Sequence, residues 1–161
     1  MDEQIAAMEG CRYLFLSEIQ ELSQNGLRIV VSEGMSVGEA EPVQVGGTSI
    51  LGGTLIEVTE ESNTFELIWN EYVVYSLLNE SYANVDDEER YDGNRFRVYS
   101  KSHFIEYTSR ASFANADCPG PTQHFGIVCE NHVVNVISAA PPTITATGRS
   151  FNSSRSKQHL M

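Results

Sequence analysis

Two cysteines and two histidines in the last third of the chain are the residues whose types could do chemistry together. Cys118, His124, Cys129 and His132 follow the spacing C-x5-H-x4-C-x2-H. Thiolate and imidazole are zinc ligands, but the short paired spacings of structural zinc sites, such as C-x2-C, are missing. Side chains alternate along a strand, so a strand here would direct Cys129 away from the two histidines. We therefore expect no metal, with Cys129 in the core and the histidines along a surface.

The same four residues could instead supply a cysteine nucleophile with a histidine base. This chemistry needs a base within hydrogen-bond reach and a third group that orients it, and the sequence identifies neither. Cys118 begins the turn Cys-Pro-Gly-Pro, so it is expected to be exposed and to be the more reactive thiol. A Cys118–Cys129 disulfide stays open as an alternative. Three cysteines at wide spacing fit a reducing compartment better.

One carboxylate interrupts the most apolar stretch of the chain, which runs from Phe65 to Leu78. Every second residue from Phe65 is apolar or aromatic except Glu71, and Trp69 and Tyr75 lie on the same predicted face. A carboxylate directed into a core needs a partner, and a buried Glu71 near Tyr75 could act as an acid with a raised pKa. Alternatively, a bulge near Asn70 turns Glu71 to solvent or a salt bridge holds it. We favour these alternatives, because bulges re-aim strand side chains.

A pocket is predicted between the sheet and a helix over residues 103–112. Tyrosines in the strands would give this pocket both apolar surface and hydroxyl groups. Its polar lining is expected to consist of Glu71, Tyr75, Arg97, Tyr99, His103 and His124. Such a pocket would make the protein a small ligand-binding domain or an enzyme.

Four consecutive acids form a second candidate site, the acidic loop Asp86, Asp87, Glu88 and Glu89. The loop lacks the spaced ligands and central glycine of a calcium-binding EF-hand. A run of like charges is typically solvated. We interpret this loop as the surface that faces a basic partner.

The hydrophobic pattern predicts about six strands and two helices that must position these residues. Cys11, Phe15, Ile19 and Leu22 are spaced by four, four and three residues, which predicts a helix over 11–24 that ends at Asn25-Gly26. Ser102 is the expected N-cap of the second helix. Strands are expected at 27–32, 54–59, 65–78, 95–100 and 124–138, with a brief one at 42–45, and the segment 124–138 is either one strand or a hairpin around Glu130-Asn131.

The arrangement of these elements is typical of an α+β fold. Residues 33–53 are expected to form a long loop whose glycines match no phosphate-binding fingerprint, and 54–59 should pair with 65–78 as a hairpin. No crossover helices separate the strands regularly, so the sheet should be mainly antiparallel, with the two helices packed on it. We expect a single domain over 1–146 and a disordered basic tail over 147–161.

Composition narrows the class of protein. The chain has 161 residues, of which 41% are hydrophobic, and this length is typical of one domain. No apolar run approaches the roughly 18 residues of a membrane helix, and the acidic N-terminus does not resemble a signal peptide. We expect a cytoplasmic protein without a cofactor.

Charge is distributed unevenly along the chain. Residues 1–89 contain 18 acids and two bases, whereas residues 90–161 contain four acids and eight bases, which gives the net charge of −12. An acidic surface repels nucleic-acid phosphates and attracts basic partners. Nucleic-acid binding by the folded part is therefore disfavoured.

These observations lead to three hypotheses of function. The first is a small acidic protein-binding module, of which a concrete version is an immunity-type inhibitor that masks a basic partner such as a nuclease toxin. The second is the small ligand-binding domain or enzyme with its pocket beside the helix over 103–112. The third is a homo-oligomeric component whose exposed sheet edge pairs with a second copy. Without a nucleophile, metal or nucleotide motif, we expect a binding protein rather than an enzyme.

Overall fold

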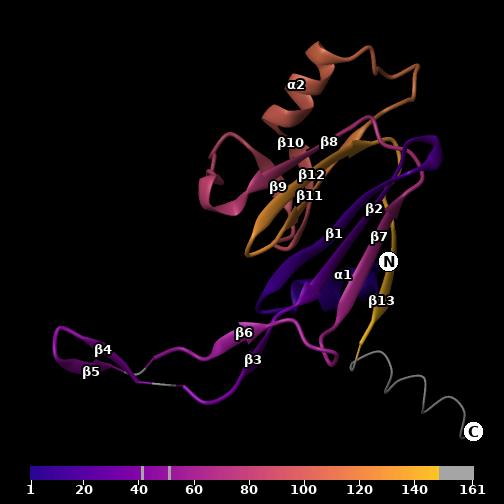
Figure 1. The fold of residues 1–161 in the computed structure, drawn as a ribbon. Coiled ribbons are helices and arrows are strands. Elements are labelled where there is room, and N and C mark those ends of the chain that lie inside the picture. The colour runs from indigo at the N-terminus through magenta and orange to yellow at the C-terminus, as the bar shows by residue number, and fades with distance from the viewer. Residues whose placement is uncertain (41, 51, 149–161) are drawn as a thin grey trace, which may run out of the picture.

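Two antiparallel sheets packed face to face form the body of the protein (Figure 1). The computed structural model describes residues 1–40, 42–50 and 52–148. The four-stranded sheet has the order β1-β2-β7-β13, with bounds Leu14–Leu22, Gly26–Glu33, Thr64–Trp69 and Thr143–Thr147. The five-stranded sheet has the order β8-β12-β11-β10-β9, with bounds Val74–Asn79, His132–Ser138, Gln123–Val128, Phe96–Lys101 and Arg90–Asp92.

The hydrophobic core lies between these two sheets. Leu27, Ile29 and Val31 of β2 alternate with outward-facing residues, and all three are fully buried. Trp69 of β7 packs on Phe125 of β11 with ring centroids 6.1 Å apart, which joins the two sheets directly. The core therefore explains why the apolar strands alternate as they do.

Helix α1 (Asp2–Glu9) packs against both sheets. It contacts β13 of one sheet and β10 of the other, and Met8 is fully buried in the shared core. The Glu9 carboxylate accepts hydrogen bonds from the backbone N–H groups of Asn94, Arg95 and Phe96 at 2.9–3.0 Å. This short helix thus ties the turn between β9 and β10 to the core.

Helix α2 (His103–Ala111) adds a third layer on the outer face of the five-stranded sheet (Figure 1). It contacts β11 and β12, whose inner faces contribute Phe125, Ile127, Val134 and Val136 to the core. The sheet is therefore covered on both sides, by the second sheet and by α2.

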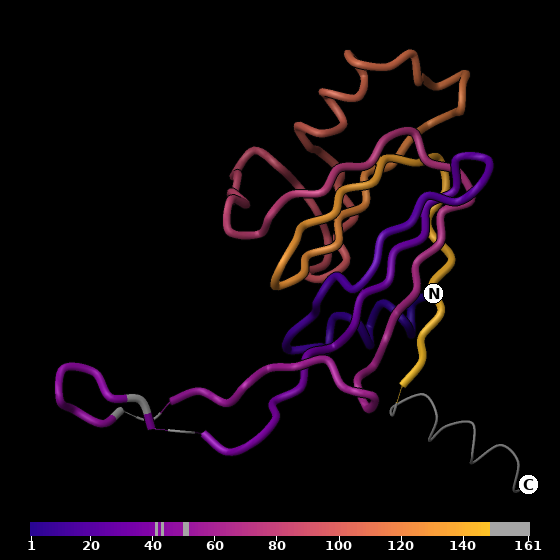
Figure 2. The backbone as a smooth tube through the Cα atoms, in the orientation of Figure 1, coloured from indigo at the N-terminus to yellow at the C-terminus, as the bar shows by residue number. Residues whose placement is uncertain are grey.

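A long β-hairpin arm leaves the body between β2 and β7 (Figure 2). We define the arm as the described residues from 35 to 58, which are 35–40, 42–50 and 52–58. Its base is the pair β3 (Met35–Val37) and β6 (Leu55–Glu57), and its tip is the pair β4 (Val43–Val45) and β5 (Thr48–Ile50). Gly46 and Gly47 join the tip strands with φ of 57° and 81°, the two positive values that a type I′ turn requires.

The prediction of a helix over 11–24 is wrong, because this segment contains strand β1. A register shift between Leu16 and Glu18 breaks the period of two, so Leu14, Leu16 and Ile19 face the core side at spacings of two and three. The strict alternation that identifies a strand is therefore missing from this segment. At Asn25-Gly26, predicted as a helix stop, Asn25 instead ends a short 3-10 helix (Ser23–Asn25) that connects β1 to β2, and Gly26 begins β2.

The prediction of one strand over 65–78 is also wrong. The strand is interrupted at residues 70–73, near the expected bend. The two resulting strands, β7 and β8, belong to different sheets. The predicted hairpin of 54–59 with 65–78 does not form, because β6 pairs with β3 while β7 pairs with β2 and β13. Residues 33–53 contain three short strands rather than one.

Several predictions agree with the structure. The fold combines helices with antiparallel sheets, although several sheets replace the single sheet of about six strands. Helix α2 begins after Ser102, and β11 and β12 form the hairpin at Glu130-Asn131. Of the predicted tail, Thr147 still pairs with Thr64, whereas residues 149–161 lie outside the described residues. Within the described part of the chain, no helix is long and apolar enough to cross a membrane.

Candidate binding site between helix α2 and the five-stranded sheet

A pocket lies between α2 and the outer face of the five-stranded sheet. Its volume is about 360 Å³, and it is open to solvent on one side. The sheet supplies the floor, α2 one wall, and the segment between β8 and β9 the other wall. The lining residues are Leu78, Ala83, Asn84, Glu89, Arg97, Tyr99, His103, Phe104, Tyr107, His124, Val133 and Asn135.

Four of the six residues predicted to line this pocket are brought together there: Arg97, Tyr99, His103 and His124. Tyr99 and His124 are direct cross-strand neighbours on β10 and β11, and Arg97 lies two residues before Tyr99 on the same face. The alternation of strand side chains, together with the helix start at Ser102, is what makes these four converge. The other two, Glu71 and Tyr75, lie elsewhere.

A buried hydrogen-bond network attaches the first turn of α2 to the sheet. The Ser102 hydroxyl accepts from the Ile105 backbone N–H at 3.1 Å and lies 2.8 Å from His124 Nδ1. His124 Nε2 lies 3.0 Å from Asn135 Oδ1. Because the Asn135 oxygen can only accept, Nε2 carries the proton, and Nδ1 accepts from the Ser102 hydroxyl.

His124 is a neutral structural residue rather than a base. It is 2% exposed, and burial lowers its pKa to about 4. Its ring stacks on Tyr99 with centroids 3.9 Å apart and meets Phe104 of α2 edge-on at 5.4 Å. Ser102 is only 3% exposed and already caps the helix. The Ser102–His124–Asn135 network therefore positions α2 and is not available as a nucleophile.

Gly126 on the central strand β11 allows Tyr99 to lie across the pocket floor. A Cβ atom at Gly126 would approach Tyr99 Cε2 to 2.9 Å, which is closer than packed atoms tolerate. Burial raises the pKa of the Tyr99 hydroxyl, although Arg97 beside it acts in the opposite direction. Tyr99 is therefore neutral at physiological pH.

Arg97 is the cation of the pocket floor. Its guanidinium lies over the Tyr91 ring at 4.2 Å, a cation–π contact. Its Nε atom is buried without a hydrogen-bond partner, and among the described residues no carboxylate forms an ion pair with it. This half-buried charge is thus only partly satisfied within the chain.

The acidic loop borders the same pocket. Asp86 Oδ2 lies 3.0 Å from His103 Nε2, and Glu89 accepts from the His103 backbone N–H at 3.1 Å. The hydrogen bond with Asp86 raises the pKa of His103, while a backbone hydrogen bond from Glu88 and the His103 contact lower the pKa of Asp86. The loop and the pocket, predicted as separate sites, are therefore one surface.

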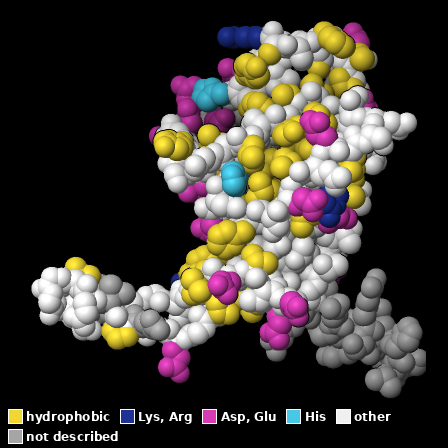
Figure 3. Space-filling model, viewed as in Figure 1, with side chains coloured by type: hydrophobic (Ala, Val, Ile, Leu, Met, Phe, Trp, Pro, Cys, Tyr) yellow, Lys and Arg dark blue, Asp and Glu magenta, His cyan; other side chains and the backbone are white. Residues whose placement is uncertain are grey.

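Exposed apolar side chains surround this surface. Among the described residues, eleven large apolar side chains are exposed, and five of them lie on the pocket lining or on the segments and strand beside it: Leu78, Tyr82, Val85, Tyr91 and Tyr107. Figure 3 shows hydrophobic side chains gathered near α2, with acidic side chains beside them. We use the name α2 face for the pocket, these side chains and the acidic loop.

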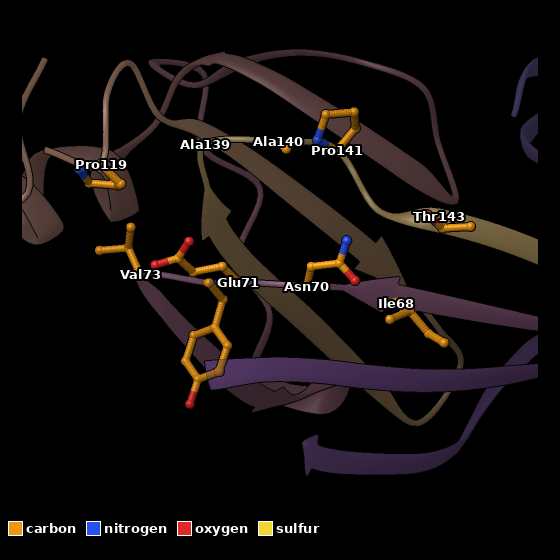
Figure 4. Close-up of a pocket in the computed structure, with 10 residues that line it drawn as sticks. Ile68, Asn70, Glu71, Val73, Pro119, Ala139, Ala140, Pro141 and Thr143 are labelled. Atoms are coloured by element: carbon orange, nitrogen blue, oxygen red, sulfur yellow. The ribbon is translucent and has the colours of Figure 1, made fainter. Parts of the chain in front are cut away.

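Glu71 and Tyr75 lie outside the α2 face. Glu71 is exposed in the segment that crosses from β7 to β8, as the favoured interpretation of a turned-out carboxylate predicts, and it lines a different cavity of about 200 Å³ (Figure 4). Tyr75 packs against the core side of β8, and its hydroxyl donates to Glu21 at 3.1 Å. The break between β7 and β8 separates both residues from the pocket.

The four residues of the C-x5-H-x4-C-x2-H pattern do not converge. Within the part of the chain that the structure describes, no group of three or more cysteine, histidine or acidic side chains could hold a metal ion. Cys129 is in the core as predicted, and burial raises its thiol pKa to about 12, which makes it a poor nucleophile. Cys118 is exposed as predicted, and both are free thiols. The expectation that both histidines line a surface is wrong for His124, because α2 covers it.

Sequence reasoning missed two polar members of the site. Asn135 interrupts the apolar run of β12 between Val134 and Val136, and this interruption was a usable signal because a polar residue among buried neighbours needs a partner. The second role of Ser102, as the partner of His124, had no sequence signal. It depends on the packing of α2 across β11.

Comparison of the chain with protein-family models, curated proteins and solved structures found no match.

Proposed function

We propose that this protein is a protein-binding module that uses its α2 face to hold a basic partner. The observation that carries the proposal is the position of exposed apolar side chains directly beside acidic groups that lack partners. Exposed apolar patches with polar rims are typical of protein interaction sites. A more specific version of the proposal is an inhibitor of the immunity type, which masks the basic active surface of a nuclease toxin.

The apolar part of the α2 face supplies the expected binding energy. Tyr107 on α2 is 60% exposed and Tyr82 is 79% exposed, and neither ring belongs to the hydrophobic core. Tyrosine is enriched among the residues that dominate binding at protein interfaces. The shallow, open pocket that Tyr107 lines offers space for one side chain of the partner.

The charged part supplies the preference for a basic partner. Asp86 and Glu89 are engaged with His103, but the carboxylates of Asp87 and Glu88 form no hydrogen bond or ion pair with any described residue. Unpaired exposed acids accelerate association with a basic protein and make the association rate sensitive to salt. The net charge of −12 acts in the same direction.

Affinity capture from the lysate of the native host tests this proposal. The immobilised protein should retain a basic protein at low salt and lose most of it at high salt, where the Debye length falls to about 3 Å. Asp87→Asn with Glu88→Gln should reduce capture, and Tyr107→Ser should reduce it further because it removes apolar contact area. Asp2→Asn with Glu3→Gln is the matched control, since it removes two adjacent exposed acids far from α2 in the fold. Equal capture by all variants would contradict the proposal.

A second candidate function uses the pocket for a small anionic ligand. The observation that favours it is Arg97, whose buried Nε lacks a partner in a pocket that also holds Asn135 and His103. Such a ligand would complete the hydrogen bonding of the guanidinium. Thermal-shift measurements with small carboxylates and phosphates should show stabilisation that Arg97→Gln removes. No shift with any anion would exclude this candidate.

A further inference from the structure

No described side chain of the arm belongs to the hydrophobic core. None of its side chains that the structure describes is buried, and Val45, Leu55 and Val58 are 55%, 62% and 48% exposed. Ordering each of its residues costs roughly 1–2 kcal/mol of conformational entropy, and the arm buries little apolar surface in return. Contacts with a partner outside the monomer would offset this cost.

The root of the arm is fixed, so the arm leaves the body in a defined direction. The Glu33 backbone N–H donates to the Asn63 carbonyl at 2.8 Å, and the Asn63 side chain donates to Glu33 Oε2 at 2.6 Å. A Cβ atom at Gly34 would lie 2.5 Å from the Phe15 ring and 2.8 Å from Ile56, so the chain is tightly packed there. The arm is thus a rigidly mounted projection at its base.

The tip of the arm is an incomplete sheet. Strands β4 and β5 pair only with each other, through three residue pairs. An isolated two-stranded hairpin is at best marginally stable in water, and a third strand is needed for independent stability. At about 3.3 Å per residue, the stretch from Met35 to the Gly46-Gly47 turn reaches up to roughly 40 Å from the root, more than twice the width of the four-stranded sheet.

The same chain has a sheet edge that lacks a strand. Strand β13 reads Thr-Ile-Thr-Ala-Thr, has no charged residue or bulge, and pairs with β7 on one side only among the described residues. Thr143, Thr145 and Thr147 are exposed. Helix α1 contacts β13, but the strand has neither the charged residues nor the bulge that usually protect an edge from pairing with another chain.

The other three edges are less suitable for the arm. Strand β1 is bulged, and Asn131 forms two hydrogen bonds with the Leu16 backbone along it. Strand β9 has three residues, two of them charged. Strand β8 is flanked by Glu71 and Glu80, which would repel the arm, because residues 29–89 contain no lysine or arginine.

We propose that the arm of one copy of this chain adds its β4–β5 hairpin to the β13 edge of a second copy. The addition would extend the four-stranded sheet of the second copy and give the tip the third strand that it lacks. Donor and acceptor are different surfaces, so the contact is heterologous and continues from copy to copy, into a closed ring or a filament. This inference is independent of the partner proposed for the α2 face.

Two variants separate the donor from the acceptor. In the first, Asn-Gly replaces residues 38–54, which closes the β3–β6 ladder at the Val37–Leu55 pair with a two-residue turn and removes the tip. In the second, Thr145→Glu places a charge on the acceptor edge, a change that disfavours strand pairing. Leu77→Glu on β8 is the matched control for the other long, uncharged edge.

Sedimentation velocity across the micromolar concentration range tests the proposal. The full chain and Leu77→Glu should associate as concentration rises. The arm-shortened chain should stay monomeric, and Thr145→Glu should weaken association about tenfold, which corresponds to roughly 1.4 kcal/mol. The arm-shortened chain keeps the acceptor edge but has no donor hairpin, whereas Thr145→Glu keeps the donor hairpin but has a weakened acceptor edge. A mixture of these two variants, with Thr145→Glu in excess, should show little assembly beyond a pair of copies.

Three results would overturn the proposal. The full chain could remain monomeric throughout the concentration range, the arm-shortened chain could associate as strongly as the full chain, or Leu77→Glu rather than Thr145→Glu could abolish association. Circular dichroism of each variant shows whether the sheets are intact, so that loss of association is not confused with loss of the fold.

Discussion

At the scale of single residues, His124 couples the stability of the fold to pH. Its folded pKa of about 4 lies below the ordinary value of 6.5, so the unfolded chain binds a proton more readily than the folded one between these values. The contribution to stability is therefore complete above about pH 6.5 and is lost as the pH falls toward 4.

The first prediction follows from this difference. Between about pH 7 and about pH 5, titration of His124 should lower the free energy of unfolding by about 2 kcal/mol. Urea unfolding of the wild type and of His124→Gln at both values measures it. The variant should be less stable at neutral pH, and its further loss on acidification should be smaller by this amount. An identical pH dependence in both proteins would show that His124 is not buried in its neutral form.

The residues of the pocket also show what a sequence can and cannot specify at this scale. Arg97, Tyr99 and His124 were predictable, because alternation on two adjacent strands places them on one face. In a single strand over 65–78, Glu71 and Tyr75 would share one face, and the sequence therefore predicts both residues in the same pocket. The prediction failed for them where the chain leaves one sheet for the other.

At the scale of elements, α2 depends on one hydroxyl that has two partners. Ser102 satisfies the Ile105 backbone N–H at the start of the helix and the Nδ1 atom of buried His124. Removal of the hydroxyl therefore takes away a helix cap and leaves a buried acceptor unpaired at the same time. Either loss alone destabilises a protein by about 1 kcal/mol or more.

The second prediction is that Ser102→Ala lowers the free energy of unfolding by about 2 kcal/mol. Ser109→Ala is the matched control, because the Ser109 hydroxyl is exposed and bonds only to the Glu106 carbonyl of its own helix. The control should change stability by no more than about 0.5 kcal/mol. Equal effects of the two substitutions in urea unfolding would mean that the helix is not attached through His124.

Element boundaries were predictable where local chemistry decides them. The start of α2 and the β11–β12 hairpin follow from capping and turn residues close in sequence. Strand β1 was not predictable in this way, since its bulge interrupts the alternation that identifies a strand. Strand β13 was missed because its alternating threonines, in a short polar segment after two prolines, resemble a linker until β7 is placed beside them.

At the scale of the whole molecule, the charge asymmetry of the sequence has a structural counterpart. The arm belongs to the stretch 29–89, which contains no lysine or arginine, and the acidic loop ends the same stretch. These two acidic segments lie in separate parts of the structure, one on the arm and one on the α2 face (Figure 1). The molecule thus has two separate candidate contact surfaces, one for its own copies and one for a basic partner.

The third prediction concerns helix α1. Loss of its contacts with the core should destabilise both sheets together. Met8 is fully buried between them, and the adjacent Glu9 holds the β9–β10 turn. Met8→Ala should lower the free energy of unfolding by about 2–4 kcal/mol, since it leaves a cavity where both sheets meet. Leu55→Ala, a similar truncation at a 62% exposed position of the arm, should change it by no more than about 0.5 kcal/mol.

Urea unfolding followed by Trp69 fluorescence and by circular dichroism distinguishes this prediction from a local effect. Trp69 reports on the interface between the sheets, because its ring packs on Phe125, whereas circular dichroism reports on all strands. If α1 joins one cooperative core, both signals should shift to the same lower midpoint in Met8→Ala. Separate midpoints would show that the two sheets unfold independently and that α1 belongs to only one of them.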